Sequence, residues 1–215
     1  METNTAHLPD PDDPAPMSNG IKVYHTDVKY GGVSFAVVGD RIFKSEPSSV
    51  AFWDEGRKDH LKMKLDDPSV LDNDTLKMLG NRQMEFLQNW VTDWKKAEIK
   101  VLLSQTLFAN VATHHGYKNN FLYGDLDSGG WPKSARDRTL RLIRKCFAFH
   151  LNGDQHLPSL VHYGIDECRD AGWSFCTPAI AVGYPRSFLP DTLGWPVKNR
   201  PEHGHPNTGC YTDAF

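Results

Sequence analysis

A Gly-Asp-x-His segment at residues 153–156 carries the pair of side chains in this sequence with the clearest capacity for chemistry. Asp154 and His156 lie two residues apart, and a carboxylate and an imidazole at this spacing can share or bridge metal ions. We expect Gly153 to let the backbone turn sharply, so that both side chains project from one tight loop. From the residues alone, the alternative is that Asp154 caps the following turn and that His156 is an ordinary polar residue.

A second candidate is Arg41, which follows an apolar run at residues 33–38. Its planar guanidinium offers a fork of N–H donors that fits a phosphate group. The alternative is an ordinary surface or salt-bridge arginine. We interpret the remaining histidine pairs as loop residues outside the site: His114-His115, His203-Gly204-His205 and the Asp59-His60 pair.

The elements that must position these residues alternate between apolar runs and helical periodicity. Two runs rich in β-forming residues, at 23–25 and 33–38, flank Gly31-Gly32 and predict a hairpin or two neighbouring strands. Residues 99–103 predict a buried strand that ends at Ser104-Gln105. Between them, the spacing of four apolar residues predicts a helix whose stripe packs in the core: Met84, Leu87, Val91 and Trp94.

The second half of the chain repeats this alternation. Ser134 and Asp137 resemble a capping box and predict a helix with Leu140 and Ile143 on its apolar side. Residues 146–149 predict a buried strand that runs directly into the Asp154 segment, and residues 175–182 predict a further strand. The order strand, helix, strand, helix, strand predicts an α/β domain with at least some parallel strands.

This topology predicts where the polar residues meet. Three expected strands end in polar residues, at 40–41, 104–105 and 154–156. In open α/β sheets, ligands gather at the carboxyl ends of the strands. We therefore expect these three strand ends to form one site.

Composition and charge narrow the class of protein. A chain of 215 residues with 39% hydrophobic residues suits one globular domain. A net charge of −3 provides no global attraction to nucleic acid or anionic lipid, so we expect no sequence-specific nucleic-acid binding. The sequence shows neither an apolar run of about 18 residues nor an N-terminal export signal, so we expect no membrane span, and the compartment stays open. The four cysteines form no CxxC pair, which argues against a structural zinc cluster.

The domain organisation follows from composition along the chain. Residues 1–20 alternate proline and aspartate and predict an extended, solvated segment. Residues 21–182 hold the expected domain, with a loop-rich insertion at 45–72. Residues 183–215 are rich in proline and glycine and predict a tail that is mainly loop.

The segment at residues 146–164, with its Gly-Asp-x-His core, resembles the PhoD-like alkaline phosphatase family of metallophosphoesterases. Further segments match that family in the same order, at residues 79–87, 101–106 and 127–138, and Arg41 matches the arginine that ends an earlier family strand. The match is imperfect at Gly39, where relatives often have an acidic residue. The resemblance covers nearly the whole chain.

The resemblance implies a partial metallophosphoesterase-like sandwich with a mixed, partly parallel sheet and flanking helices. It implies hydrolysis of phosphomonoesters or phosphodiesters at a multinuclear centre of iron and calcium. Asp154 and His156 match the late metal-ligand motif of the family, and the resemblance gives His156 and Arg41 catalytic roles. Two metals would hold phosphate oxygens, activate a water and stabilise the in-line transition state.

The resemblance also predicts an incomplete site. The early metal ligands of the family lie upstream of a segment that resembles residues 5–16, so the chain corresponds to a central and C-terminal part, and two residues cannot hold a binuclear centre. One expectation is a phosphoric-ester hydrolase completed by a missing N-terminal segment or a partner chain. The rival expectation is a non-catalytic remnant, or half of a split enzyme, with apolar surface left open where strands should pack. A metal-independent binding module is a third interpretation. Relatives are often exported.

Overall fold

The computed structural model describes residues 25–41, 43–50, 59–61, 65, 67–167, 169–181, 183–189, 197–199 and 211–214. The segment 1–20, His203 and His205 lie outside these residues, so the expectations for them stay predictions. The backbone alone is described for 197–199 and 211–214.

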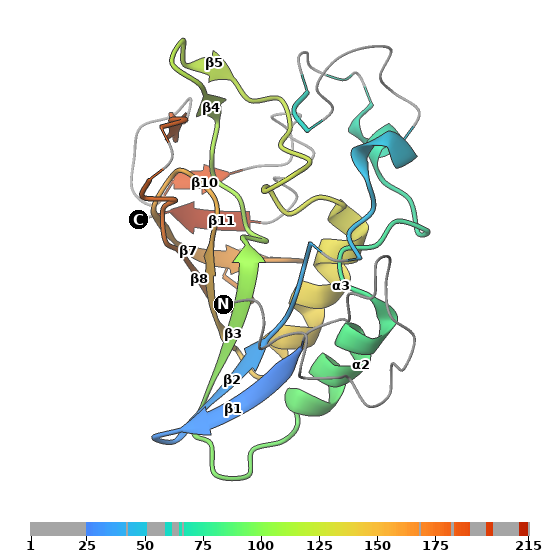
Figure 1. Ribbon diagram of the computed structural model, residues 1–215, viewed down its shortest axis with the longest axis vertical. Helices are drawn as coiled ribbons and strands as arrows, with labels where there is room; N and C mark the ends of the chain where they lie inside the picture. Colours follow the sequence, from blue (N-terminus) through green and yellow to red (C-terminus); the bar gives the residue numbers. More distant parts are fainter. Residues whose placement is uncertain are drawn as a thin grey trace.

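An eight-stranded mixed sheet forms the centre of the molecule, in the order β1-β2-β3-β6-β8-β7-β11-β10 (Figure 1). The predicted hairpin is present: β1 (Thr26–Tyr30) pairs antiparallel with β2 (Val33–Val37) across Gly31-Gly32. Four strands then run parallel, from β2 through β3 (Ile99–Thr106) and β6 (Phe149–Gly153) to β8 (Trp173–Cys176). The remaining strands, β7 (Ser159–Gly164), β11 (Tyr211–Ala214) and β10 (Val197–Asn199), pair antiparallel. The predicted α/β class with a mixed, partly parallel sheet is therefore confirmed.

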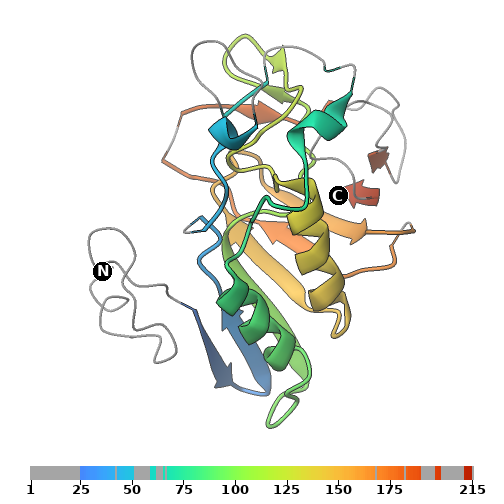
Figure 2. The same cartoon turned by 90° about the vertical axis from the view of Figure 1, so that its right-hand side faces the viewer.

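Two helices, α2 (Asn81–Trp90) and α3 (Lys133–Arg144), cover one face of this sheet (Figures 1 and 2). Leu87 and Trp90 of α2 and Leu140 and Ile143 of α3 are buried in one core with Leu102 of β3. These helical residues recur at spacings of three, which places them on one stripe of each helix. The helices thus bury the side of the sheet to which Leu102 belongs. None of the helices among the described residues is both long and apolar enough to cross a bilayer.

The opposite face of the sheet is also apolar. The register aligns Val28, Phe35, Val101 and Phe149 in one row, and Val37, Leu103, Leu151, Phe175 and Leu160 in the next. Val28 is 52% exposed and Phe175 is 38% exposed, and within the described residues both α-helices lie on the other side. Strands with two apolar faces read as continuous hydrophobic runs, which is why residues 99–103 predicted a buried strand.

A second, three-stranded sheet lies beyond the carboxyl end of β3 (Figure 1). It consists of β5 (Asn120–Phe121), β4 (His114–His115) and β9 (Arg186–Ser187), with β4 in the middle. Two short 3-10 segments, η2 (Pro47–Ser49) and η3 (Pro68–Leu71), lie in the predicted loop-rich insertion. A smaller apolar cluster joins this insertion to Leu126 and Trp131.

Several boundaries differ from the expectations. Helix α2 ends at Trp90, and Trp94, expected in the core, is 45% exposed. Helix α3 is preceded by Pro132, and Ser134 does not cap it, because its N–H and hydroxyl both donate to the carboxylate of Asp72. The strand expected at 146–149 starts only at Phe149, because Phe147 has a φ of 48° and interrupts the extended backbone.

Two further segments contain strands where the sequence predicted something else. The strand expected at 175–182 corresponds to β8, which begins at Trp173 and ends at Cys176. Strand β7 was not predicted from the sequence. The range 183–215, expected to be mainly loop, contributes β9, β10 and β11 to the two sheets. These strands are four residues or shorter and form by pairing with distant partners, so local sequence patterns carry little signal for them.

Candidate functional site

The carboxyl ends of β2 and β6 bring Arg41 and Asp154 together, as the parallel topology predicted. The Nη2 atom of Arg41 donates to Oδ2 of Asp154 at 2.5 Å and to Oδ2 of Asp127 at 2.9 Å. All three side chains are at least one-third exposed, so the group is open to a ligand from solvent. Arg41 therefore stands between two carboxylates at the edge of the sheet.

Asp40 positions Arg41 but does not face the site. It is 1% exposed, and its carboxylate accepts hydrogen bonds from the backbone N–H of Gln105 at 2.7 Å and of Thr106 at 3.1 Å. The hydroxyl of Thr106 donates to the same carboxylate. Asp40 thereby ties the end of β2 to the end of β3 and sets the point from which Arg41 extends. The polar carboxyl end of β3 therefore has a structural role, because it donates the hydrogen bonds that hold Asp40.

The backbone turn after β6 is made by Asp154 rather than by Gly153. Asp154 has a φ of 64°, in the left-handed region, which aspartate tolerates better than most residues. A Cβ atom built on Gly153 meets nothing closer than 3.5 Å, which is ordinary contact. The expected role of Gly153 was therefore wrong: its position accommodates a side chain, and the sharp turn follows one residue later.

The ring of His156 is held through its Nδ1 atom. Its Nδ1 lies 2.5 Å from the carbonyl oxygen of Tyr184, which accepts only, so Nδ1 carries the proton. When the ring carries only this proton, its lone pair lies on Nε2. Histidines that bind metals are commonly oriented in this way, by a carbonyl that fixes the tautomer. The structure does not bring His156 into a hydrogen bond with Arg41 or Asp154 among the interactions of the described residues.

A second cation lies beside Arg41. The Nζ atom of Lys44 donates to the backbone carbonyl of Asp127 and lies 5.9 Å from the centre of the Trp131 ring. Burial lowers the pKa of Lys44 below its ordinary value, although the carboxylates of Asp125 and Asp127 act in the opposite direction. Two cations next to two carboxylates make a site in which an incoming anion can exchange for a carboxylate.

The donor set fits one edge of a metal site. Carboxylate oxygen from Asp154 and imidazole nitrogen from His156 are the mixed ligands that iron accepts, and calcium prefers the oxygen. Within the described residues, however, there is no group of three or more histidine, cysteine or acidic residues placed to hold a metal ion. The described residues therefore do not complete a multinuclear centre by themselves.

Sequence reasoning missed Asp127, Lys44 and Tyr184. Asp127 begins the segment 127–138 that contributed to the family resemblance, so its position carried a signal that was not interpreted as part of the site. Lys44 and Tyr184 lie in no recognised motif, and their roles depend on how distant loops pack.

The mixed sheet, the helices on one face and the polar ends of its parallel strands define an α/β fold that is also found among solved structures. In agreement, the chain is similar to the solved structure of PhoD, with a TM-score of 0.53 and 20% sequence identity over 78% of this chain and 31% of that one. A purple acid phosphatase isolated from yellow lupin (Lupinus luteus) seeds matches 84% of this chain and 27% of its own, with a TM-score of 0.43 and 12% identity. The chain thus spans about a third of the length of the PhoD chain. No protein-family model and no curated protein sequence matches it.

Proposed function

We propose that this chain is a phosphoric-ester hydrolase in which Arg41 binds the phosphate group and Asp154 and His156 each supply one ligand to a metal ion. The observation that carries the proposal is the meeting of Arg41, Asp154 and Asp127 at the carboxyl edge of the parallel strands. This is where open α/β sheets bind their ligands. The similarity of the fold to PhoD supports the same class of activity.

The residues of the chain have distinct tasks in this proposal. The guanidinium of Arg41 exchanges a carboxylate partner for phosphate oxygens, and Lys44 adds a second positive charge nearby. The carbonyl of Tyr184 keeps the proton of His156 on Nδ1, so that Nε2 stays available as a ligand. A metal ion bound there supplies Lewis acidity and acidifies a water molecule. Iron and calcium are the metals we propose, with further ligands from outside the described residues.

Phosphomonoesters and phosphodiesters both carry the group that Arg41 would bind, so the proposal covers both. Residues of this chain outside the described ranges are the proposed source of the remaining ligands, and a chain that instead needs a missing N-terminal segment or a partner chain is the second candidate below.

A specific observation favours a second candidate, a non-catalytic remnant or one half of a split enzyme that binds a partner chain. The sheet face opposite to α2 and α3 carries two rows of apolar residues, of which Val28 and Phe175 are more than one-third exposed. Such a surface is typical of a face that packs against another layer. In this case the chain alone would fold but would not turn over substrate.

The test compares hydrolysis of glycerol phosphate and of a simple dialkyl phosphate by the purified chain, with and without iron and calcium. We expect metal-dependent turnover that falls at least about tenfold in Asp154→Asn and in Arg41→Ala, because each removes a charge from the site. Arg41→Lys keeps the charge but loses the planar fork, so we expect an intermediate rate. Arg138→Ala is the matched control, since Arg138 is 48% exposed on α3 and pairs weakly with Asp74 at 3.9 Å.

Equal turnover in wild type and Asp154→Asn would contradict the proposed site. A chain that is folded by circular dichroism but inactive with both substrates would favour the second candidate.

A further inference from the structure

A second group of side chains lies beside the proposed site, on the three-stranded sheet. Cross-strand pairing aligns Asn120, His115 and Arg186 in one row across β5, β4 and β9. The ring of His60 stacks on that of His115, with centroids 5.0 Å apart and planes 13° apart. Both histidines had been interpreted as loop residues without a role. The structure instead joins them in one stacked pair.

The charges in this group are matched by partners inside the protein. Nη1 of Arg186 lies 2.8 Å from Oδ2 of the fully buried Asp125, and Nη2 donates to Nε2 of His60 at 2.9 Å. Since arginine only donates, Nε2 of His60 is unprotonated, and Nδ1 carries the proton and faces Asp59 at 3.2 Å. Burial raises the pKa of Asp125, but the charge of Arg186 and the hydrogen bonds from Ser128 act in the opposite direction, and the pKa lies below its ordinary value. Arg186 therefore supports the stacked histidines rather than offering a free cation.

His115 is likewise held as a neutral ring. Its Nδ1 lies 2.8 Å from the hydroxyl of Tyr184. Burial lowers the pKa of His115, and the neighbouring His60 and Arg186 lower it further. The two stacked imidazoles thus present flat faces.

These residues line a pocket of about 480 Å³ whose walls are largely aromatic. The lining residues are Asp59, His60, Leu61, His115, Asn120, Phe121, Tyr123 and Tyr184. The pocket therefore combines five flat rings with two polar groups, the carboxylate of Asp59 and the amide of Asn120. Flat walls favour a planar ring, and a few polar groups fix its orientation by hydrogen bonds.

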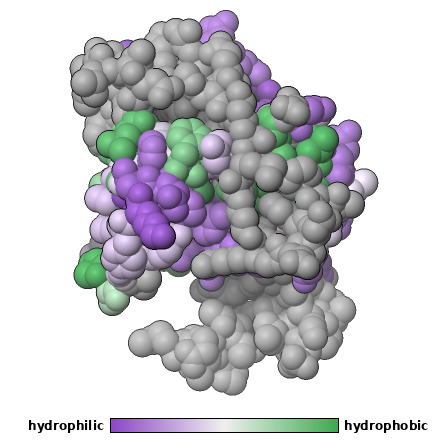
Figure 3. All heavy atoms as spheres, turned by 90° about the horizontal axis from the view of Figure 1, so that it is seen from above, coloured by the Kyte–Doolittle hydropathy of each residue, from purple (hydrophilic) through white to green (hydrophobic). Residues whose placement is uncertain are grey.

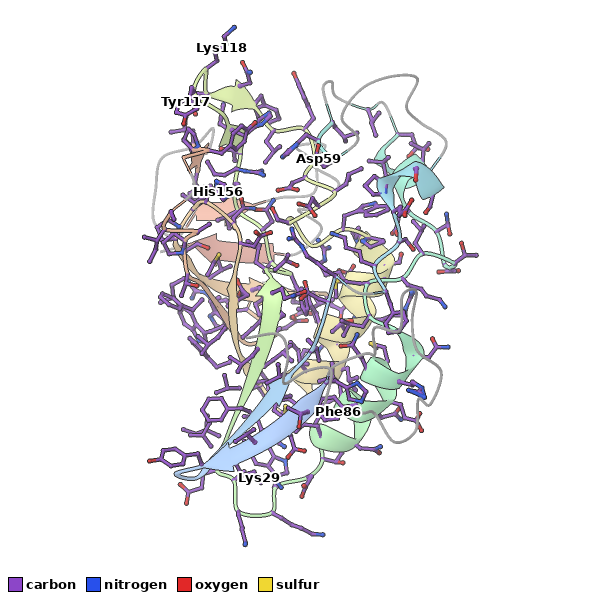
Figure 4. All side chains as sticks on the ribbon, in the orientation of Figure 1. Lys29, Asp59, Phe86, Tyr117, Lys118 and His156 are labelled. Carbon is purple, nitrogen blue, oxygen red and sulfur yellow. The ribbon has the colours of Figure 1, made fainter. Side chains whose placement is uncertain are left out.

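Tyr184 connects this pocket to the proposed phosphate site. Its carbonyl holds His156, its hydroxyl contacts His115, and its ring centroid lies 6.1 Å from that of His156 and 6.4 Å from that of His60. Asp59 and His156 both lie beyond the carboxyl end of β3 (Figure 4). Seen from this end, hydrophobic and hydrophilic residues lie side by side on the surface (Figure 3). Tyr184 therefore lies next to both His156 and the pocket.

We propose that this pocket binds the heteroaromatic base of a nucleotide whose phosphate lies against Arg41 and His156. The inference rests on the proposed hydrolase function. In the reaction, the oxygen of water bonds to phosphorus, the bond between phosphorus and the ester oxygen breaks, and a proton from the water ends on the leaving nucleoside. The pocket holds the leaving group, with the base between aromatic rings and its N–H groups near Asp59.

The experiment measures binding of adenosine, inorganic phosphate and adenosine 5′-monophosphate to the purified full chain by isothermal titration calorimetry. We expect adenosine to bind the wild type and Phe121→Ser to weaken this binding about tenfold, as loss of a stacking ring does. Phe175→Ser is the matched control: Phe175 is 38% exposed and Phe121 is 37% exposed, but Phe175 lies on the central sheet. Arg41→Ala is expected to weaken phosphate binding and to leave adenosine binding unchanged.

Asn120→Ala provides a second variant at an exposed position, should Phe121→Ser lower the unfolding temperature. We expect it to weaken adenosine binding several-fold without changing phosphate binding. The proposed pocket would be overturned if the wild type did not bind adenosine. It would also be overturned if Phe121→Ser and Asn120→Ala both bound adenosine as tightly as the wild type.

Hydrolysis of glycerol phosphate, which has no ring, tests the hydrolase function separately. Turnover of glycerol phosphate without adenosine binding would overturn the proposed base pocket and would still support the hydrolase function. Adenosine binding that depends on Phe121, without turnover, would support the pocket and contradict the hydrolase.

Discussion

The pKa of His150, a polar residue beneath the strand ends, depends strongly on its surroundings. It is fully buried on β6, its Nε2 lies 2.7 Å from the hydroxyl of Ser104, and its ring packs 4.5 Å from that of Phe108. Burial lowers the pKa of His150 to about 3. The ring is therefore neutral in the folded protein over the whole range in which an exposed histidine gains a proton.

This burial makes stability depend on pH. Unfolded His150 takes up a proton near pH 6.5 and the buried ring only near 3, so the unfolded state binds more protons in this window. The free energy of unfolding then falls as pH falls below 6.5, by up to about 1.4 kcal/mol per pH unit. We expect His150→Gln to flatten the decline in unfolding temperature between pH 7 and pH 5, measured by circular dichroism. An equally steep decline in the variant would show that other groups cause it, and His162→Gln, at a half-buried position, is the control.

At the scale of elements, helix α2 fixes the end of strand β2 through one side chain. Gln83 is fully buried, its Oε1 accepts from the N–H of Gly39 at 2.7 Å, and its Nε2 donates to the carbonyl of Gly39 at 3.0 Å. Gly39 immediately precedes Asp40 and Arg41. The first turn of α2 thus satisfies the backbone where the strand ends and holds the segment that presents Arg41.

Replacement of Gln83 tests this connection. Gln83→Met keeps the volume but leaves the N–H and the carbonyl of Gly39 without these partners, at a cost of about 2 kcal/mol or more in the free energy of unfolding. We also expect weaker phosphate binding, because Arg41 loses its anchor. Gln88→Met on the exposed side of the same helix should change stability by less than about 0.5 kcal/mol. Urea unfolding of both variants is the measurement, and similar values for the two would refute the role of Gln83.

At the scale of the whole molecule, the two faces of the central sheet differ in how they are covered. Helices α2 and α3 bury the face that contains Leu102, which is 0% exposed. Leu103 points to the other face and is half-buried within the described residues. A sheet that is apolar on both faces and covered by helices on one side is suited to receive a second layer.

Alanine substitution of two neighbouring leucines of β3 tests this difference between the two faces. We expect Leu102→Ala to cost about 2–5 kcal/mol, since a large cavity forms between the sheet and the helices. Leu103→Ala should cost about 1 kcal/mol, because its side chain loses less buried area. Chemical denaturation of both variants gives the two values. Equal costs would mean that another part of the chain covers the second face.

Part of this architecture could be predicted from local patterns. The hairpin at Gly31-Gly32 and the apolar strand around Leu102 follow from turn chemistry and continuous apolar runs. The predicted positions of Arg41 and Asp154 at the carboxyl ends of two strands of one sheet followed from topology, and the structure places the two side chains in contact across β3. Boundaries were less predictable: Phe147 adopts a positive φ where a strand was expected, because it lies in the turn that ends α3, where its N–H donates to the carbonyl of Arg144.

The sequence by itself determined the alternation of the central strands with two helices, the mixed α/β class and two of the residues that meet at the sheet edge. Only the tertiary structure decided that Asp127 joins Arg41 across 86 residues and that Arg186 contacts His60 across 126 residues. Periodicity reports which side of an element is buried, and this is a local property that follows from the spacing of apolar residues. The pairing of loop residues instead depends on how separate elements pack, and no local pattern encodes that packing.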